Sequence, residues 1–155
     1  MTPEQKPTLL LIDGHSLAFR AFYALNPENF KNSQGQHTNA IHGFISMLLT
    51  ILEQHKPTHL CVAFDVSRES FRTKELPEYK GTRGETPVEF IGQTELLVEA
   101  LTAMRITSVS REMFEADDLI ASLANIGESN GYEVLIVSGD RDTFQLITEK
   151  TKILY

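Results

Sequence analysis

Three carboxylates fall within four positions of the segment Phe114-Glu115-Ala116-Asp117-Asp118-Leu119-Ile120-Ala121, immediately before an apolar helical run. A predicted strand in the segment Glu133-Val134-Leu135-Ile136-Val137-Ser138-Gly139-Asp140-Arg141-Asp142 also ends in two acids. Carboxylates this close repel one another, so a positive charge must lie among them if they converge in the fold. A hard divalent cation is the natural candidate, because such ions prefer oxygen ligands.

Outward from these segments, short apolar runs alternate with helical patterns along the chain. Residues 8–12 and 60–64 are continuous apolar runs, typical of strands buried on both faces of a parallel sheet. The other predicted strands are 106–109, 132–137 and 152–155. The predicted helices are 17–25, with Ser16 as its cap, 39–55, 88–104, 115–130 and 142–147. This alternation predicts one α/β domain with a mainly parallel sheet flanked by helices.

The composition suits a single domain with a sizeable core, since 41% of the 155 residues are apolar. No run reaches the roughly 18 apolar residues of a membrane span, and the N-terminus has no apolar signal core. We therefore expect a cytoplasmic protein with no membrane partner. The net charge of −7 argues by itself against nucleic acid, whose phosphates bind Lys and Arg. Cations bound among the acids would cancel part of that charge locally.

Acids follow the predicted strands at their carboxyl ends. Asp13 and Asp65 follow the first two strands, and Asp140 and Asp142 follow a later one. In a parallel sheet these ends share one edge, where α/β folds place their sites. The acids of residues 115–118 begin a helix whose position the pattern does not give. For any single acid a helix cap or a solvated charge is the simpler interpretation. Acids at so many strand ends nevertheless indicate a metal cage. The candidate metal ligands are Asp13, Asp65, Glu115, Asp117, Asp118, Asp140 and Asp142.

Such a cage supports hydrolysis of a phosphodiester with two Mg²⁺ or Mn²⁺ ions. No protein nucleophile is then required, so Ser16 and Ser138 are interpreted as turn and cap residues. The five histidines show no metal-ligand spacing, which disfavours a zinc site.

The stretch from Val66 to Pro87 is long and basic for an acidic chain. Its basic residues can track a nucleic-acid backbone, and Tyr79 can stack on a base. The alternative is a solvated loop whose basic residues pair with neighbouring glutamates. Arg20, on the first predicted helix, is either a surface charge or a phosphate ligand. The basic residues of the stretch are Arg68, Arg72, Lys74, Lys80 and Arg83.

Six motifs occur in the order and context of one known family. The chain resembles the 5′ nuclease domain found at the N-terminus of bacterial DNA polymerase I, a relative of flap endonucleases and phage 5′ exonucleases. The resemblance runs from about Thr8 to Tyr155. The motifs are Leu11-Ile12-Asp13-Gly14-His15-Ser16, Ala63-Phe64-Asp65, Phe71-Arg72, Glu78-Tyr79-Lys80-Gly81-Thr82-Arg83, Glu115-Ala116-Asp117-Asp118 and Ser138-Gly139-Asp140-Arg141-Asp142.

The resemblance implies a PIN-like fold with a helical arch at about residues 66–87. It implies metal-dependent cleavage of DNA at 5′ flaps, nicks and 5′ ends, for primer removal and repair, with RNA primers as further substrates. The seven acids would hold two Mg²⁺ or Mn²⁺ ions. Lys80 and Arg83 would contact the scissile phosphate. The implied nucleic-acid-binding residues are Arg20, Arg72, Lys74, Tyr79, Lys80 and Arg83.

The family's domain continues beyond the matching motifs. It has a further strand, a Gly-Asp-x-Ser-Asp-Asn segment with the last metal ligand, a helix-hairpin-helix and then the polymerase portion. We therefore expect residues 1–155 to be the N-terminal part of such a domain. One alternative is a non-catalytic nucleic-acid-binding fragment. Another is a phosphatase of the haloacid dehalogenase type, which requires an acid two residues after the first Asp, where this chain has His15.

Overall fold

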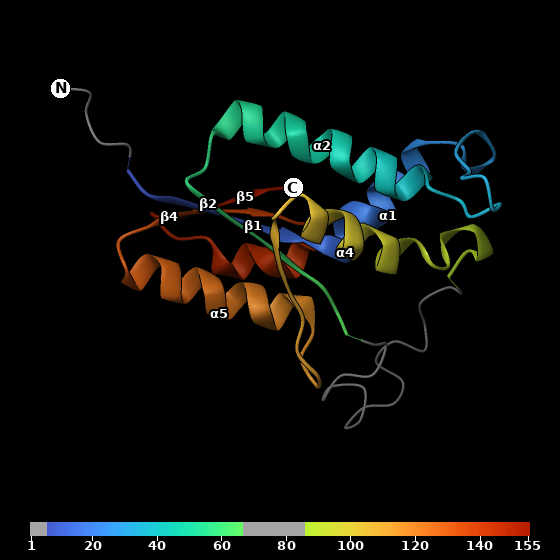
Figure 1. The fold of residues 1–155 in the computed structure, drawn as a ribbon. Helices are drawn as coiled ribbons and strands as arrows, with labels where there is room; N and C mark the ends of the chain where they lie inside the picture. Colours follow the sequence, from blue (N-terminus) through green and yellow to red (C-terminus); the bar gives the residue numbers. More distant parts are fainter. Residues whose placement is uncertain (1–5, 67–85) are drawn as a thin grey trace.

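A five-stranded, wholly parallel sheet in the order β3-β2-β1-β4-β5 forms the centre of the molecule (Figure 1). The structure, a computed structural model, describes residues 6–66 and 86–155. The strands are β1 (Thr8–Asp13), β2 (His59–Ala63), β3 (Thr107–Val109), β4 (Glu133–Val137) and β5 (Thr151–Leu154). The predicted α/β class with a parallel sheet is confirmed. The predicted arch at about 66–87 lies almost wholly outside the described residues.

Four α-helices and three short 3₁₀ helices surround the sheet in the described part of the chain. The predicted helix at 39–55 is confirmed at both ends, because its apolar residues recur at helical spacing. Lys56 ends it in the left-handed conformation. The helices are α1 (Gly14–Ala24), η1 (Pro27–Asn29), α2 (Asn39–His55), η2 (Val88–Phe90), α4 (Gln93–Ala103), α5 (Ala116–Ser129) and η3 (Arg141–Leu146).

The sheet is covered on both faces, as its continuous apolar strands predict. Alternate residues of β1 point to opposite faces. Leu10 and Ile12 pack in a large core with α1, α2 and α4, whereas Leu11 packs in a smaller core with α5. Figure 1 shows α5 on one side of the sheet and α1 with α2 on the other. Within residues 6–66 and 86–155, no helix is both long and apolar enough to cross a membrane.

Two local predictions are wrong. The segment 88–104 is not one helix, because Gly92 adopts a φ of 86° and separates η2 from α4. That conformation favours glycine, and a Cβ there would lie 2.7 Å from Oε1 of Gln36. Ser16 is not the cap of α1. The carboxylate of Asp13 takes that role and accepts a hydrogen bond from the Ser16 backbone N–H at 3.2 Å.

Candidate active site

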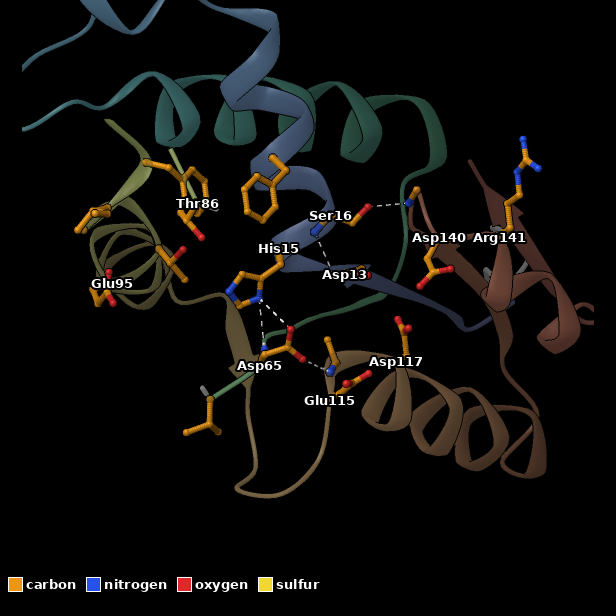
Figure 2. A pocket seen from close by; sticks show the side chains of 18 of the residues that line it. Asp13, His15, Ser16, Asp65, Thr86, Glu95, Glu115, Asp117, Asp140 and Arg141 are labelled. Carbon is orange, nitrogen blue, oxygen red and sulfur yellow. Dashed lines mark hydrogen bonds and ion pairs between the residues drawn. The ribbon is translucent and has the colours of Figure 1, made fainter. Parts of the chain in front are cut away.

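Five of the seven predicted metal ligands line one pocket at the carboxyl edge of the sheet (Figure 2). The cavity has a volume of about 890 Å³. These five predicted ligands come from the ends of β1, β2 and β4 and from the start of α5. The sheet and α5 therefore bring together residues that lie more than 120 positions apart in the sequence. The five acids are Asp13, Asp65, Glu115, Asp117 and Asp140.

Asp13, the last residue of β1, is the most buried of the acids that follow strands. It is 7% exposed, and its two oxygens accept hydrogen bonds from the Ser16 backbone N–H at 3.2 Å and the Ser138 hydroxyl at 3.3 Å. Burial, together with the nearby charges of Asp65 and Asp140, raises the pKa of Asp13 to about 6. The two hydrogen bonds act in the opposite direction and lower it. The β1 end therefore holds its carboxylate in a fixed orientation.

A hydrogen bond from α5 to Asp65 fixes the position of the start of α5, which the sequence pattern did not give. Oδ1 of Asp65 accepts a hydrogen bond of 2.7 Å from the backbone N–H of Ala116, the first residue of α5. The carboxylate after β2 thus binds the N-terminus of that helix, where negative charge is favoured. This contact brings Glu115 and Asp117 to the same edge as Asp13. His15 lies beside Asp65, and its Nδ1 accepts the Asp65 backbone N–H at 3.3 Å.

Asp117 and Asp140 face each other in the pocket (Figure 2). Burial raises the pKa of Asp117 to about 8. The charge of Asp13, a hydrogen bond with the Asp140 carboxyl group and the charges of Asp140 and Asp65 contribute to this rise after burial. With this pKa, Asp117 retains its proton near neutral pH in the metal-free pocket.

Two predicted ligands lie outside the pocket lining. The Asp118 carboxylate accepts the backbone N–H of Glu115 at 2.9 Å, as part of a capping box at the start of α5. Asp142 is exposed in η3, and its backbone N–H donates to Oδ1 of Asp140 at 2.9 Å. Arg20 is exposed on α1, outside the lining. Five predicted nucleic-acid-binding residues lie outside the described residues, namely Arg72, Lys74, Tyr79, Lys80 and Arg83.

Several lining residues were not predicted as site residues. His15 and Ser16 follow Asp13 in the same turn, so their place beside a strand-end acid was the available signal. Glu95 and Thr86 lie across the pocket from Asp117 and Asp140, whereas Arg141 points away from the acids (Figure 2). Nothing in the sequence placed Glu95 here, because its position depends on the packing of α4.

The chemistry of the lining fits a hard divalent cation. Its donors are carboxylate oxygens, and positive charge would relieve the repulsion that raises their pKa values. Residues 6–66 and 86–155 do not contain three His, Cys, Asp or Glu side chains that already form a ligand group for one ion.

Solved phage proteins share the fold of this chain. The T5 D15 protein co-crystallised with metal ions superposes with a TM-score of 0.70 at 24% identity, covering 95% of this chain and 53% of that one. A T5 D15 flap endonuclease complex with DNA and metal ions gives a TM-score of 0.67 at 22% identity, covering 95% and 54%. These likenesses confirm the predicted PIN-like architecture of the sheet and its helices.

Sequence comparison identifies the family. DNA polymerase I of Mycobacterium bovis is 55% identical over 150 residues, which cover 97% of this chain. DNA polymerase I of Bacillus subtilis is 46% identical over 153 residues, which cover 99%. The chain spans about 17% of the length of each of these relatives. A profile of the 5′-3′ exonuclease N-terminal, resolvase-like domain matches residues 8–155. The chain therefore belongs to the 5′-3′ exonuclease N-terminal, resolvase-like domain family.

Proposed function

We propose that this chain is the N-terminal part of a metal-dependent 5′ nuclease domain that hydrolyses DNA phosphodiesters at 5′ flaps, nicks and 5′ ends. The observation that carries this proposal is the convergence of five of the predicted metal ligands, from four elements, on one pocket. Two of these groups, Asp13 and Asp117, have pKa values raised by burial and by neighbouring carboxylates. Raised pKa values of this kind show that the charged forms of Asp13 and Asp117 are disfavoured in the metal-free fold, and a cationic ligand would relieve that cost.

Each acid has a proposed part in the site. Asp13, Asp65, Glu115, Asp117 and Asp140 would hold two Mg²⁺ or Mn²⁺ ions. Asp118 and Asp142, in the same two turns, complete the proposed set of seven. When bound, the ions supply a water of lowered pKa and neutralise charge on the attacking and leaving oxygens. Asp117 must first release its proton, so binding strengthens as the pH rises towards 8.

The basic stretch has the complementary proposed part. Lys80 and Arg83 would contact the scissile phosphate, where their positive charge stabilises the transition state. An arch at about 66–87 would carry them over the pocket. Val66 and Thr86, at the two ends of that stretch, both line the pocket. Arg72, Lys74, Tyr79 and Arg20 would bind the nucleic-acid strand.

The relatives support this assignment of substrate and cofactor. One T5 D15 structure contains DNA and metal ions, and a T5 5′-exonuclease structure contains zinc. The curated relatives are DNA polymerases I, about six times longer than this chain. We therefore place the chain next to a polymerase portion, in primer removal and DNA repair in the cytoplasm, with RNA primers among its substrates. The family match argues against a haloacid-dehalogenase-type phosphatase.

A non-catalytic nucleic-acid-binding fragment is the second candidate. The absence of a ready three-ligand group in the described residues favours it, because the family's further aspartate would then be needed to complete the metal site. Such a fragment would bind flap DNA without cutting it in Mg²⁺ or Mn²⁺.

Cleavage of a 5′-labelled flap duplex separates the two candidates. The chain would be assayed with Mg²⁺ or Mn²⁺, with EDTA, and beside the variant Asp13→Ala. Cleavage that requires metal and disappears in the variant supports the nuclease. Binding without cleavage, measured by fluorescence anisotropy on the same duplex, supports the fragment. Cleavage in EDTA, or undiminished cleavage by Asp13→Ala, would contradict the proposed metal centre.

A further inference from the structure

The Ser138 hydroxyl lies between the two acids that end neighbouring strands. It donates a hydrogen bond to Oδ2 of Asp13 at 3.3 Å and accepts one from the backbone N–H of Asp140 at 3.1 Å. Ser138 is 1% exposed, so water does not compete for its hydroxyl group. A single buried hydroxyl therefore links the carboxylate after β1 to the backbone of the acid after β4.

The Ser16 hydroxyl makes a second link between the same two turns. It accepts a hydrogen bond of 2.6 Å from the backbone N–H of Gly139, while the Ser16 backbone N–H binds Oδ1 of Asp13 at 3.2 Å. Gly139 permits this approach, because a Cβ there would lie 2.9 Å from the Ser16 oxygen and 3.4 Å from Nη2 of Arg20. A side chain at position 139 would push α1 away from the turn after β4.

The backbone hydrogen bonds that pair β1 with β4 do not extend to these turns. The β1–β4 register ends at Ile12 opposite Val137, one residue before Asp13 and three before Asp140. Beyond that point, two acids of like charge follow strands that lie side by side, and their repulsion favours separation. The hydroxyls of Ser16 and Ser138 link the two turns and hold them together against this repulsion.

We infer that Ser16 and Ser138 are positioning residues of the metal centre, whose hydroxyls fix the Asp13 carboxylate relative to Asp140. This inference rests on the proposed function and assigns work to two serines that the sequence indicated only as turn and cap residues. Neither hydroxyl acts as a nucleophile. Each binds a ligand residue rather than the ion, and such partners typically set metal affinity by about 10–100-fold.

Binding of Mn²⁺ to the whole 155-residue chain, measured by electron paramagnetic resonance at pH 8, provides the test. Ser138→Ala and Ser16→Ala should each weaken Mn²⁺ binding about 10-fold. Ser16→Thr, which keeps the hydroxyl, should bind nearly as the unsubstituted chain does. Gly139→Ala should weaken binding without removing a polar group. Ser122→Ala, at an exposed position of α5, is the matched control and should change nothing.

A thermal unfolding curve for each variant accompanies the titration, so that loss of the fold is not mistaken for loss of affinity. Folded Ser138→Ala and Ser16→Ala variants with unchanged Mn²⁺ affinity would overturn the inference and leave the proposed function standing. So would an equal loss in Ser122→Ala or in Ser16→Thr. If the unsubstituted chain binds no Mn²⁺ at millimolar concentration, the proposed metal centre fails first, and this inference fails with it.

Flap cleavage gives a second, independent readout. Because the Ser138 hydroxyl is buried and contacts proposed ligand residues, Ser138→Ala should lower kcat with little change in KM. A rise in KM alone would place Ser138 in substrate binding and contradict the positioning role.

Discussion

The two sides of the pocket are held by different kinds of bond. On the acidic side, burial and the charges of neighbouring carboxylates raise the pKa values of Asp13 and Asp117. On the opposite side, the wall formed by η2 and the start of α4 is held by neutral amides. The first arrangement favours binding of a cation at the expense of stability, whereas the second favours stability through uncharged amides. We call this second side the neutral side for those amides, although Glu89 and Glu95 also lie on it.

The neutral side depends on two fully buried amides, Gln93 and Asn39. Oε1 of Gln93 accepts the backbone N–H of Ala40 at 2.8 Å, and its Nε2 donates to Asn39 at 2.8 Å and to the Glu89 carbonyl at 3.0 Å. Asn39 in turn donates to the Phe22 carbonyl at 2.9 Å. The network joins α1, α2, η2 and α4, and so places the neutral wall opposite the acids.

The difference between the two sides predicts opposite effects of substitution. Removing the charge of Asp117, whose pKa is raised, should impair function and preserve or increase stability. Removing an amide should lower stability, because its buried partners would lose their hydrogen bonds. Natural sites that oppose stability in this way are commonly functional.

The largest expected effect is on cleavage by Asp140→Asn. The variant removes the negative charge of a proposed ligand while keeping the size of the side chain, so cleavage should fall by about 10³-fold, the upper range for losing one charge-stabilising group. Single-turnover cleavage of the labelled flap duplex measures this. Glu99→Gln, at an exposed position of α4, is the control that should cut normally. Retained activity in Asp140→Asn at saturating Mg²⁺ would remove Asp140 from the ligand set.

The second effect is on stability and belongs to the neutral side. Gln93→Ala leaves the buried backbone N–H of Ala40 and the side-chain oxygen Oδ1 of Asn39 without their Gln93 partner. It should lower the free energy of unfolding by about 2–4 kcal/mol. Urea denaturation measures the change. Gln54→Ala, at an exposed glutamine of α2, should alter the value by less than about 0.5 kcal/mol. Equal effects from the two variants would mean that the network contributes no stability.

The third effect is the pH dependence of the metal-free chain. The pKa of Asp117 rises from 3.8 to about 8 on folding, and that of Asp13 from 3.8 to about 6. The folded state therefore binds more protons than the unfolded state in this window, and stability should fall as the pH rises from about 4 to 8. Asp117→Asn should raise Tm at pH 8 by about 2–4 °C, roughly 1 kcal/mol after allowance for solvent screening.

Divalent ions provide the control for this pH dependence. Mg²⁺ at pH 8 should raise Tm of the unsubstituted chain, because it binds the folded state, and should raise that of Asp117→Asn less. A Tm that is independent of pH between 5 and 8, with and without EDTA, would contradict the proposed strain among the acids.

The smallest effect belongs to Ile91, which lines the neutral wall and is 62% exposed. Ile91→Ala removes little buried surface and should change the free energy of unfolding by less than about 0.5 kcal/mol. Urea denaturation beside Gln93→Ala checks this. A loss as large as that of Gln93→Ala would show that the wall depends on apolar packing rather than on its amides.

The sequence predicted the sheet and most helices because their signals are local. Apolar runs located β1 and β2, and helical spacing located both ends of α2. The break at Gly92 was missed because a glycine inside a helical pattern does not by itself end a helix, and the Gln36 side chain that donates to the Ile91 carbonyl at 3.0 Å lies 55 positions away. Such a contact leaves no periodic pattern in the chain.

The site could be predicted in composition but not in geometry. The acids at strand ends were visible because a parallel sheet must gather them at one edge. The position of α5 was not, because it depends on the bond from Ala116 to Asp65. Asp118 shows the same limit, since its spacing suits a metal ligand and a capping box equally well. The Ser138 bridge is a contact between turns that the chain keeps 125 positions apart.

The most direct test of the metal centre is a crystal of this chain soaked in Mn²⁺ at pH 8 and measured for anomalous scattering. We expect two peaks in the pocket, about 4 Å apart, with carboxylate oxygens of Asp13, Asp117 and Asp140 among their ligands. An empty pocket at millimolar Mn²⁺, or peaks only on surface acids such as Glu99, would contradict a metal centre at the carboxyl edge of this sheet.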